Sequence, residues 1–468
     1  MSREKLKTIL LTFLFMTSIV LTGLNLNIID YKSSENTFGR IDANKALDMV
    51  LQPERIFVHF GGGGGNNIEV IEGRIEYWKE LRQMLKNGIA NTMQVSEKDF
   101  NESQELKQLK SVEIKLPFDI SGSFFTSALG LEKSKLDKYD GIESIIIPLV
   151  DDSGIYFLLS DGNAVRMERT KIEKSQIVQQ LESELEQGNL VRYYMMSTLF
   201  PVDSDVLMPV DASGYKYLYF RGRNSVQIEN EGRVVQMAKN IFGEKYDFVN
   251  RIVETGGANT FIYGFGERVL RMQPDGAIEY LDETIKGSGI NQNDAIAKAV
   301  DFASKLGVKP SEMNLNKVEK SQIYGKDAYE FVFSYNIEGL KLKSYDSSIE
   351  DIAITVAGDS VYSYQSNIKS IEDNMTVNLF SKNDILSPQT ILNDNFDFLK
   401  REFEINMEKG KNDEVSTNIL GRIKSVELVY FLADTNVFTP AWCFYMEGQN
   451  YIFDAYTGEI LNYGLGKI

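Results

Sequence analysis

The sequence predicts an α+β protein in which one N-terminal transmembrane helix precedes a multi-domain extracytoplasmic region of helices and antiparallel sheets. Three observations support this fold class. Residues 8–29 contain no charged side chain, and a charge-free run of that length is typical of a membrane-spanning helix. Several later segments place apolar residues at helical spacing, and strictly alternating apolar residues follow them. In the last third of the chain, this succession of helix and alternating strands occurs twice.

The charge-free run, TILLTFLFMTSIVLTGLNLNII, would span about 33 Å as a helix, enough for a hydrocarbon core of about 30 Å. Arg3, Lys5 and Lys7 precede it. The positive-inside rule therefore predicts a cytoplasmic tail at 1–7, an anchor at 8–29 in the cell membrane, and the bulk of the chain outside. A cleavable signal peptide is the alternative. Because no small-residue cleavage motif follows the run, we expect an uncleaved single-pass anchor.

The composition excludes several classes of function. The 468-residue chain has a formal net charge of −17, which argues against nucleic-acid binding because that needs a basic surface. One histidine, His59, and one cysteine, Cys443, exclude intrachain disulfides, multi-cysteine metal sites and most Ser-His or Cys-His catalysis. We therefore expect no metal and no cofactor, and only carboxylate-based catalysis remains open.

Five consecutive glycines follow the histidine in the segment VHFGGGGGNNIE at 58–69. A Walker-type phosphate loop requires a Lys-Ser/Thr pair after the glycines, and the dinucleotide fingerprint requires glycine at its sixth position. Asn66 and Asn67 stand there instead, so neither nucleotide-binding pattern is met. We expect a strand over 56–58 and an unstructured glycine loop between this strand and a following helix. A lone histidine in this setting is more often structural than catalytic.

The outer region is predicted to begin with an α+β domain over 30–190 and a central α+β domain over 191–285. Apolar residues at helical spacing over 71–85 predict a helix in the first domain. The central domain combines short aromatic strands with a helix from Gly232 to Phe242 and a turn at 273–276. In the first domain, β-type runs predict hairpin-connected strands at 112–116, 144–150, 155–159 and 164–167.

Two helix-and-meander modules are predicted at 286–380 and 381–468. Asn291 is the expected N-cap of the first helix, and Ser387 followed by Pro388 opens the second. Alternation along the expected strands places one face of each in the core. The residues of these faces are Tyr329, Phe331, Phe333, Tyr335, Ile337, Trp442, Phe444 and Met446.

The C-terminal segment PAWCFYMEGQNYIFDAYTGEIL, residues 440–461, resembles the closing hairpin of PepSY-type modules. There a Pro-Ala-Trp strand is followed by a glycine turn and an Asp-Ala-x-Thr-Gly-Glu-aliphatic ending, which 454–460 match here. The resemblance implies that the last two modules are PepSY- or YycI-like. We expect Thr457-Gly458 to form the tight turn and Trp442 to anchor the core.

The order of motifs along the chain is similar to that of the YycH family. The similarity includes the anchor segment KLKTILLTFLFMTSIVLT at 5–22, the strand QPERIFVHF at 52–60 and the central stretch at 240–282. The glycine run and the segment IEGLKL at 337–342 depart from the family pattern and indicate a divergent member.

The resemblance implies a regulatory role. YycH proteins are single-pass accessory proteins of an essential two-component system that controls cell-wall metabolism in Gram-positive bacteria. A member would be a membrane-anchored extracytoplasmic protein that binds and modulates a sensor histidine kinase, together with a YycI-like sister protein. The resemblance carries over no catalytic residues and no cofactor.

Two other functions remain open on the sequence. The PepSY-like ending alone is also compatible with a membrane-tethered inhibitor or chaperone of an exported hydrolase. A carboxylate enzyme acting on wall polymers would need two acidic side chains facing each other across a cleft. Asp151-Asp152 is the most suggestive pair, but it falls in an expected hairpin turn, where solvated aspartates are common.

A candidate partner-binding face lies on the anchor. Ser18, Thr22 and Asn25 are at positions i, i+4 and i+7, so they share one face of a helix. Because lipid provides no hydrophobic drive between helices, small and hydrogen-bonding side chains hold neighbouring helices together. We predict that these residues contact the kinase within the membrane. The alternative is that Ser18 and Thr22 bond only their own helix backbone.

Overall fold

The predicted tail and anchor at 1–29 lie outside the part of the chain that the structure describes. The helices that are described are all too short or too polar to span a bilayer. Ala43–Ile468 form one compact unit. The structure is a computed structural model that describes residues 42–61, 67–71, 74–92, 94–99, 109–149, 154–168, 191–212, 215, 217–224, 231–287, 289–345, 351–367, 369–377, 384–404, 418–432 and 436–465.

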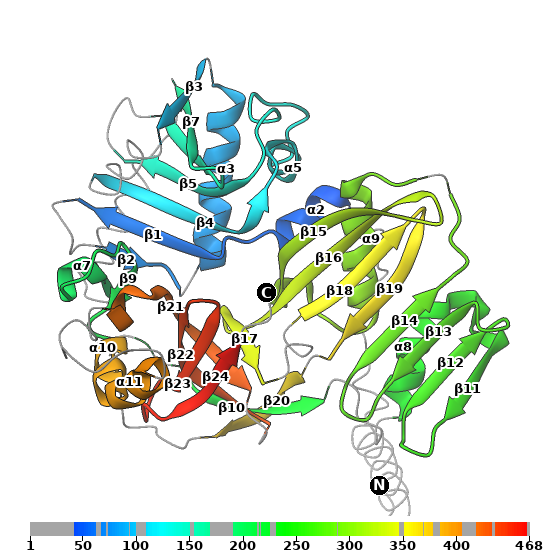
Figure 1. Ribbon diagram of the computed structural model, residues 1–468. Helices are drawn as coiled ribbons and strands as arrows, with labels where there is room; N and C mark the ends of the chain where they lie inside the picture. The colour runs from blue at the N-terminus through cyan, green and yellow to red at the C-terminus, as the bar shows by residue number, and fades with distance from the viewer. Residues whose placement is uncertain are drawn as a thin grey trace, which may run out of the picture. The chain divides into compact units, whose positions relative to one another are not determined.

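The first sheet is antiparallel and, within the described residues, has nine strands in the order β3-β7-β6-β5-β4-β1-β2-β8-β9 (Figure 1). Isoleucine-rich and aromatic runs form its centre, because branched and aromatic side chains suit a pleated, buried surface. The strands are β1 (Arg55–Phe60), β2 (Asn67–Glu69), β3 (Gln94–Asp99), β4 (Lys110–Ile120), β5 (Ile142–Pro148), β6 (Ile155–Leu159), β7 (Asn163–Glu168), β8 (Arg192–Met195) and β9 (Leu207–Pro209).

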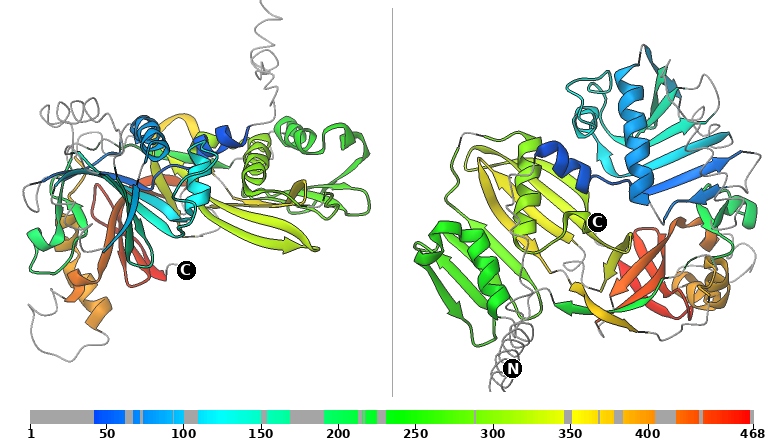
Figure 2. Two further views of the ribbon diagram at one scale, coloured as in Figure 1. Left: turned by 90° about the horizontal axis from the view of Figure 1, so that it is seen from above. Right: turned by 180° about the vertical axis from the view of Figure 1, so that it is seen from behind.

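The helix predicted over 71–85 is present as α3 (Arg74–Ala90). Its apolar stripe, which includes Tyr77, Trp78, Leu81 and Leu85, is buried, as expected for the core-facing side of an amphipathic helix. Seen from behind, α3 lies over one face of the first sheet (Figure 2). Shorter helices accompany this sheet: α2 (Ala43–Val50), α5 (Gly122–Ala128) and α7 (Met196–Leu199).

The glycine run joins two strands, and the expected strand-to-helix loop is wrong. β1 and β2 pair antiparallel, with Val58 opposite Ile68 and His59 opposite Asn67. The run is therefore the connection of a β-hairpin. β2 is three residues long, too short to show an alternating pattern in the sequence. Residues 62–66 of the run lie outside the described residues.

The second sheet contains 15 strands among the described residues, in the main order β11-β12-β13-β14-β19-β18-β16-β17-β21-β22-β10-β20. β15 pairs with β16, and β23 pairs with β22 and β24. The strands are β10 (Tyr219–Asn224), β11 (Val249–Val253), β12 (Asn259–Tyr263), β13 (Arg268–Met272), β14 (Ile278–Asp282), β15 (Met313–Ile323), β16 (Lys326–Ile337), β17 (Leu340–Ser344), β18 (Asp351–Ala357), β19 (Ser360–Ser366), β20 (Lys369–Val377), β21 (Ile423–Leu432), β22 (Val437–Met446), β23 (Gln449–Asp454) and β24 (Ile460–Leu465).

Helices accompany the second sheet as the sequence predicted, except that two helices, α10 and α11, stand in place of the one expected after Ser387. The views in Figures 1 and 2 place α8 and α9 over one face of the strands that they precede. The helices are α8 (Glu231–Phe242), α9 (Gln292–Lys305), α10 (Pro388–Asp394) and α11 (Phe396–Glu404), with 3-10 helices η2 (Gly243–Phe248) and η3 (Pro310–Glu312).

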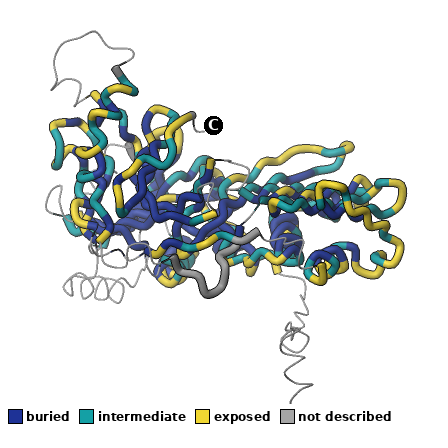
Figure 3. Tube along the Cα trace, turned by 90° about the horizontal axis from the view of Figure 1, so that it is seen from below, coloured by how far each residue is buried: buried dark blue, intermediate teal, exposed yellow. Residues whose placement is uncertain are grey.

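The buried strand faces predicted from alternation are confirmed. Figure 3 shows buried residues concentrated along the strands, and exposed residues at many of the turns. Each side chain of the predicted faces is at most 8% exposed, from Tyr329 at 8% to Phe331, Phe333, Trp442 and Phe444 at 0%. In β16 the alternate residues Glu330 and Val332 are less buried, as in a sheet with one face against the core. β22 differs, because Ala441 and Cys443 on its other face are also buried.

The predicted N-caps are confirmed. Asn291 Oδ1 accepts a hydrogen bond from the backbone N–H of Asp294 (2.9 Å) at the start of α9. Ser387 Oγ accepts one from the backbone N–H of Thr390 (3.1 Å) at the start of α10. Each cap gives a partner to an N–H group that has no acceptor within its own helix.

The C-terminal hairpin is built as predicted. Trp442 Nε1 donates to the carbonyl oxygen of Leu386 at 2.9 Å. Asp454 Oδ1 accepts hydrogen bonds from the backbone N–H groups of Tyr456 (2.8 Å) and Thr457 (3.0 Å). Gly458 follows with a φ of 74°, a conformation that costs glycine little. These contacts explain why aspartate, threonine and glycine occupy their places in this ending.

Strands from the predicted central domain, 191–285, are distributed over both sheets. β8 and β9 extend the first sheet, β10 pairs with β22 and β20, and β11 to β14 continue the second sheet. The predicted modules at 286–380 and 381–468 are joined by a parallel pair, β17 with β21, in which Leu342 lies opposite Tyr430. The exact domain boundaries stay predictions.

Candidate functional site

Two of the predicted sites cannot be placed in the structure. Ser18, Thr22 and Asn25 lie outside the described residues, and so does the pair Asp151-Asp152. In the described ranges, no three histidine, cysteine, aspartate or glutamate side chains gather closely enough to hold a metal ion.

His59 is a buried structural residue. It lies on β1, is 1% exposed, and both of its ring nitrogens have oxygen partners. Nδ1 donates to Asn67 Oδ1 at 2.8 Å, and Nε2 lies 3.0 Å from Glu113 Oε2. A general base needs a nitrogen that can reach a substrate, so this geometry supports the structural interpretation of the histidine.

An ionic cluster (Glu54, Arg55, Glu69, Lys341 and Glu427) lies where β1 and β2 meet β17 and β21. Arg55 and Glu69 form a bidentate pair, with Nε to Oε1 and Nη2 to Oε2 both at 2.7 Å. Lys341 Nζ donates to Glu54 Oε1 at 2.6 Å. Bidentate contacts such as that between Arg55 and Glu69 are among the stronger hydrogen bonds in proteins. The cluster connects elements far apart in the chain.

The charges of the ionic cluster stabilise one another. Burial alone would lower the pKa of Arg55, but Glu69 raises it above its ordinary value. Burial likewise opposes the charge of Lys341, whose pKa is raised by Glu54 and Glu427. Burial would raise the pKa of Glu427, yet the nearby cations, Arg55 first, hold it below its ordinary value. The cluster is therefore a charged, structural contact.

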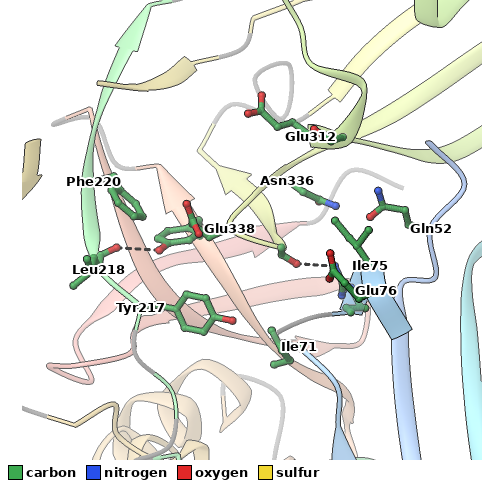
Figure 4. Close-up of a pocket in the computed structure, with 14 residues that line it drawn as sticks. Gln52, Ile71, Ile75, Glu76, Tyr217, Leu218, Phe220, Glu312, Asn336 and Glu338 are labelled. Atoms are coloured by element: carbon green, nitrogen blue, oxygen red, sulfur yellow. Dashed lines mark hydrogen bonds between the residues drawn. The ribbon is translucent and has the colours of Figure 1, made fainter. Parts of the chain in front are cut away.

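A central cavity of about 630 Å³ adjoins the ionic cluster. Figure 4 shows its labelled side chains arriving from several elements around one space. This volume lies within the range of small-molecule sites, about 300–1,000 Å³. The lining residues are Gln52, Ile71, Arg74, Ile75, Glu76, Tyr217, Leu218, Phe220, Ser311, Glu312, Asn336, Glu338, Gly339 and Tyr430.

Arg74, the first residue of α3, is the cation of the central cavity. Its Nη1 donates to the carbonyl oxygen of Glu54 (2.8 Å), and its Nη2 donates to that of Gly339 (2.6 Å). Its Nε is buried and has no acceptor among the described residues. Burial lowers the pKa of Arg74, and nearby Glu69 offsets only part of this effect. Its charge is thus held by neutral carbonyl groups.

The acidic residues of the cavity differ in their partners. Glu312 accepts hydrogen bonds from Lys309 Nζ (2.9 Å) and Tyr335 OH (3.0 Å). Glu76 and Glu338 are exposed. Glu338 stands in the turn between β16 and β17, where it has a φ of 48° and Gly339 has a φ of 79°, the values of a type I′ turn. Both residues of this turn line the cavity.

Comparison with known proteins finds a family model that is similar to the N-terminal part of the chain. Residues 4–186 match the family model described as the YycH protein, N-terminal domain. This match covers the N-terminal part of the chain. YycH-family proteins are regulatory accessory proteins and not enzymes, and they are partners of a sensor kinase in a two-component system.

The fold is similar to that of a solved YycH structure. The crystal structure of YycH from Bacillus subtilis matches with a TM-score of 0.54 at 12% identity, over 86% of this chain and 96% of that chain. At this identity the similarity concerns the fold alone. No curated protein matches the chain.

A second solved structure, the C-terminal domain of Bacillus megaterium YpeB, matches with a TM-score of 0.24 at 14% identity, over 51% of this chain and 98% of that chain. A score this low carries no argument about the fold. The PepSY-like interpretation of the last two modules therefore stays a prediction.

Proposed function

We propose that this protein is a single-pass membrane protein whose extracytoplasmic region binds and modulates the sensor histidine kinase of a cell-wall two-component system. The observation that carries the proposal is the match of residues 4–186 to the YycH N-terminal domain. The charge-free run at 8–29, preceded by Arg3, Lys5 and Lys7, supports an anchor with a cytoplasmic N-terminus. The proposed partners are the kinase and a YycI-like sister protein.

Co-purification of the full-length protein from bacterial membranes tests the proposal. We expect the sensor kinase and a second, YycI-like membrane protein among the partners identified by mass spectrometry. Recovery of an exported hydrolase without the kinase would favour the other candidate, a membrane-tethered PepSY-type inhibitor or chaperone. The only support for that alternative is the PepSY-like C-terminal hairpin that contains Trp442 and Asp454.

The anchor face Ser18, Thr22 and Asn25 is proposed as part of the kinase contact. Replacing all three residues by leucine should reduce co-purification of the kinase, because bonds between helices in lipid depend on such side chains. The matched control replaces Phe13, Met16 and Val20 by leucine and should change little. Equal behaviour of the two triple variants would place recognition in the outer region instead.

A further inference from the structure

We propose that the central cavity binds a short zwitterionic peptide, with the carboxylate of the peptide at Arg74 and its ammonium group at Glu338. This inference goes beyond the kinase-regulating role and does not depend on it. The ligand class follows from three features of the cavity wall: a cation without a carboxylate partner, a buried amide oxygen without a donor, and exposed carboxylates beside an apolar surface.

The Arg74 guanidinium provides the site for the carboxylate. No ion pair among the described residues includes Arg74, and the neighbouring carboxylates are already bound, Glu69 by Arg55 and Glu54 by Lys341. Arg74 also begins the 17-residue helix α3. The backbone N–H groups of a first helical turn and the helix dipole both favour an anion at this end. A carboxylate here would receive charge-assisted hydrogen bonds.

Asn336 provides an independent indication of a ligand. It is 8% exposed, lines the cavity, and its buried Oδ1 has no hydrogen-bond partner among the residues that the structure describes. In Figure 4 its side chain is directed toward Gln52 and Ile75, two other lining residues. A buried carbonyl oxygen without a donor is costly, by about 1–3 kcal/mol. The N–H of a peptide bond is a donor suited to it.

Glu338 provides the site for the ammonium group. Its carboxylate is exposed at the cavity, and none of the described ion pairs uses it, whereas the nearby Glu312 is paired with Lys309. The type I′ turn holds Glu338 next to Gly339, whose carbonyl oxygen binds Arg74. Both charged sites therefore lie beside the same turn, and a dipeptide is the shortest peptide that presents a free carboxylate and a free ammonium group.

The apolar part of the wall suits the side chain of such a peptide. Ile75 of α3 and Phe220 of β10 lie on opposite sides of the cavity (Figure 4). Ile71 and Leu218, which precede these two elements, also line it. A simple anion such as phosphate would leave this surface without a partner and would face the glutamates. A polyamine would face Arg74. A peptide with both termini free satisfies all of these groups.

Isothermal titration calorimetry of the full-length protein in detergent micelles tests the proposal. The probes are the dipeptide Leu-Ala as the free acid, its C-terminal amide and its N-acetyl form. We expect the free acid to bind and each blocked form to bind about 10- to 100-fold more weakly, the usual effect of losing a charged hydrogen-bond partner. No binding of the free acid, or equal affinity for the three peptides, would overturn the proposal.

A matched variant pair locates the site without disturbing the fold. Glu338→Gln should weaken binding of the free acid about tenfold and leave binding of the N-acetyl form unchanged. Glu319→Gln, on an exposed part of β15 away from the cavity, should change neither. Loss of affinity in both variants, or in neither, would contradict the assignment to Glu338. Because these results require no kinase, they are independent of the proposed partner.

Discussion

Arg74 stands where helix electrostatics disfavours a cation. The N-terminal end of a helix carries partial positive charge, so arginine is unfavourable in the first turn unless tertiary contacts hold it. Here the carbonyl oxygens of Glu54 and Gly339, separated from Arg74 by 20 and 265 positions along the chain, provide those contacts. A residue whose charge opposes the local helix dipole in this way is typical of a functional or strained site.

Trp442 is the residue with the largest expected contribution to the C-terminal module. We expect Trp442→Ala to lower the free energy of unfolding by about 3–5 kcal/mol, because it empties a buried aromatic site and leaves the Leu386 carbonyl without the Nε1 donor. Urea unfolding measures the change. Tyr445→Ala is the control, since Tyr445 lies on the same strand but is 37% exposed. Equal losses in the two variants would refute this assignment.

Among the elements, the hairpins follow from their turn residues. Tyr324-Gly325, Glu338-Gly339 and Glu447-Gly448 each place two consecutive residues at positive φ, which matches the right-handed twist of the flanking strands. The turn at Glu447-Gly448 was predictable because alternating apolar strands flank it. The sequence does not mark the turn at Glu338-Gly339 equally well, because β17 is short and its partner β21 is distant in the chain.

The cap of α9 is an element-scale feature that can be tested locally. Asn291→Ala removes the hydrogen bond to the backbone N–H of Asp294 and should destabilise the helix by about 0.5–2 kcal/mol. Amide hydrogen exchange in the first turn of α9 should become faster. Asn291→Ser retains a capping oxygen without placing a second carboxylate beside Asp294, and should exchange at nearly the original rate. If alanine and serine give the same exchange rates, the cap does not stabilise this helix.

The strands that were not predicted from the sequence, β2 and β17, share one property. β2 has three residues and β17 five, and neither is long enough to show a period of its own. Their positions depend on partners elsewhere in the chain, β2 on β8 and β17 on β21. The cavity residues Gln52, Arg74 and Asn336 escaped prediction for the same reason, since only the tertiary fold brings them together.

At the scale of the whole molecule, the ionic cluster makes stability depend on pH. The folded pKa of Glu427 is lowered by its cationic neighbours. Its contribution is therefore complete above the ordinary glutamate pKa of 4.5 and is lost as the pH falls through the lower folded value. We expect Glu427→Gln to reduce the free energy of unfolding at neutral pH by about 1–3 kcal/mol. The difference from the unmodified protein should shrink in acid.

Urea unfolding of both proteins at neutral pH and below pH 4.5 measures this dependence. Glu132→Gln is the control, because Glu132 is exposed, lies outside the helices and strands, and takes part in none of the described ion pairs. It should leave stability unchanged at both pH values. A Glu427→Gln difference that stays constant with pH would show that the carboxylate charge does not stabilise the cluster.

At the same scale, the proposed function is the regulation of a sensor kinase. The most direct test is the initial rate of autophosphorylation of the kinase, reconstituted in lipid vesicles with and without the full-length protein. We expect a clear change in this rate when the protein is present, and a smaller change with the anchor variant in which Ser18, Thr22 and Asn25 are leucine. An autophosphorylation rate that is the same with and without the protein would contradict it.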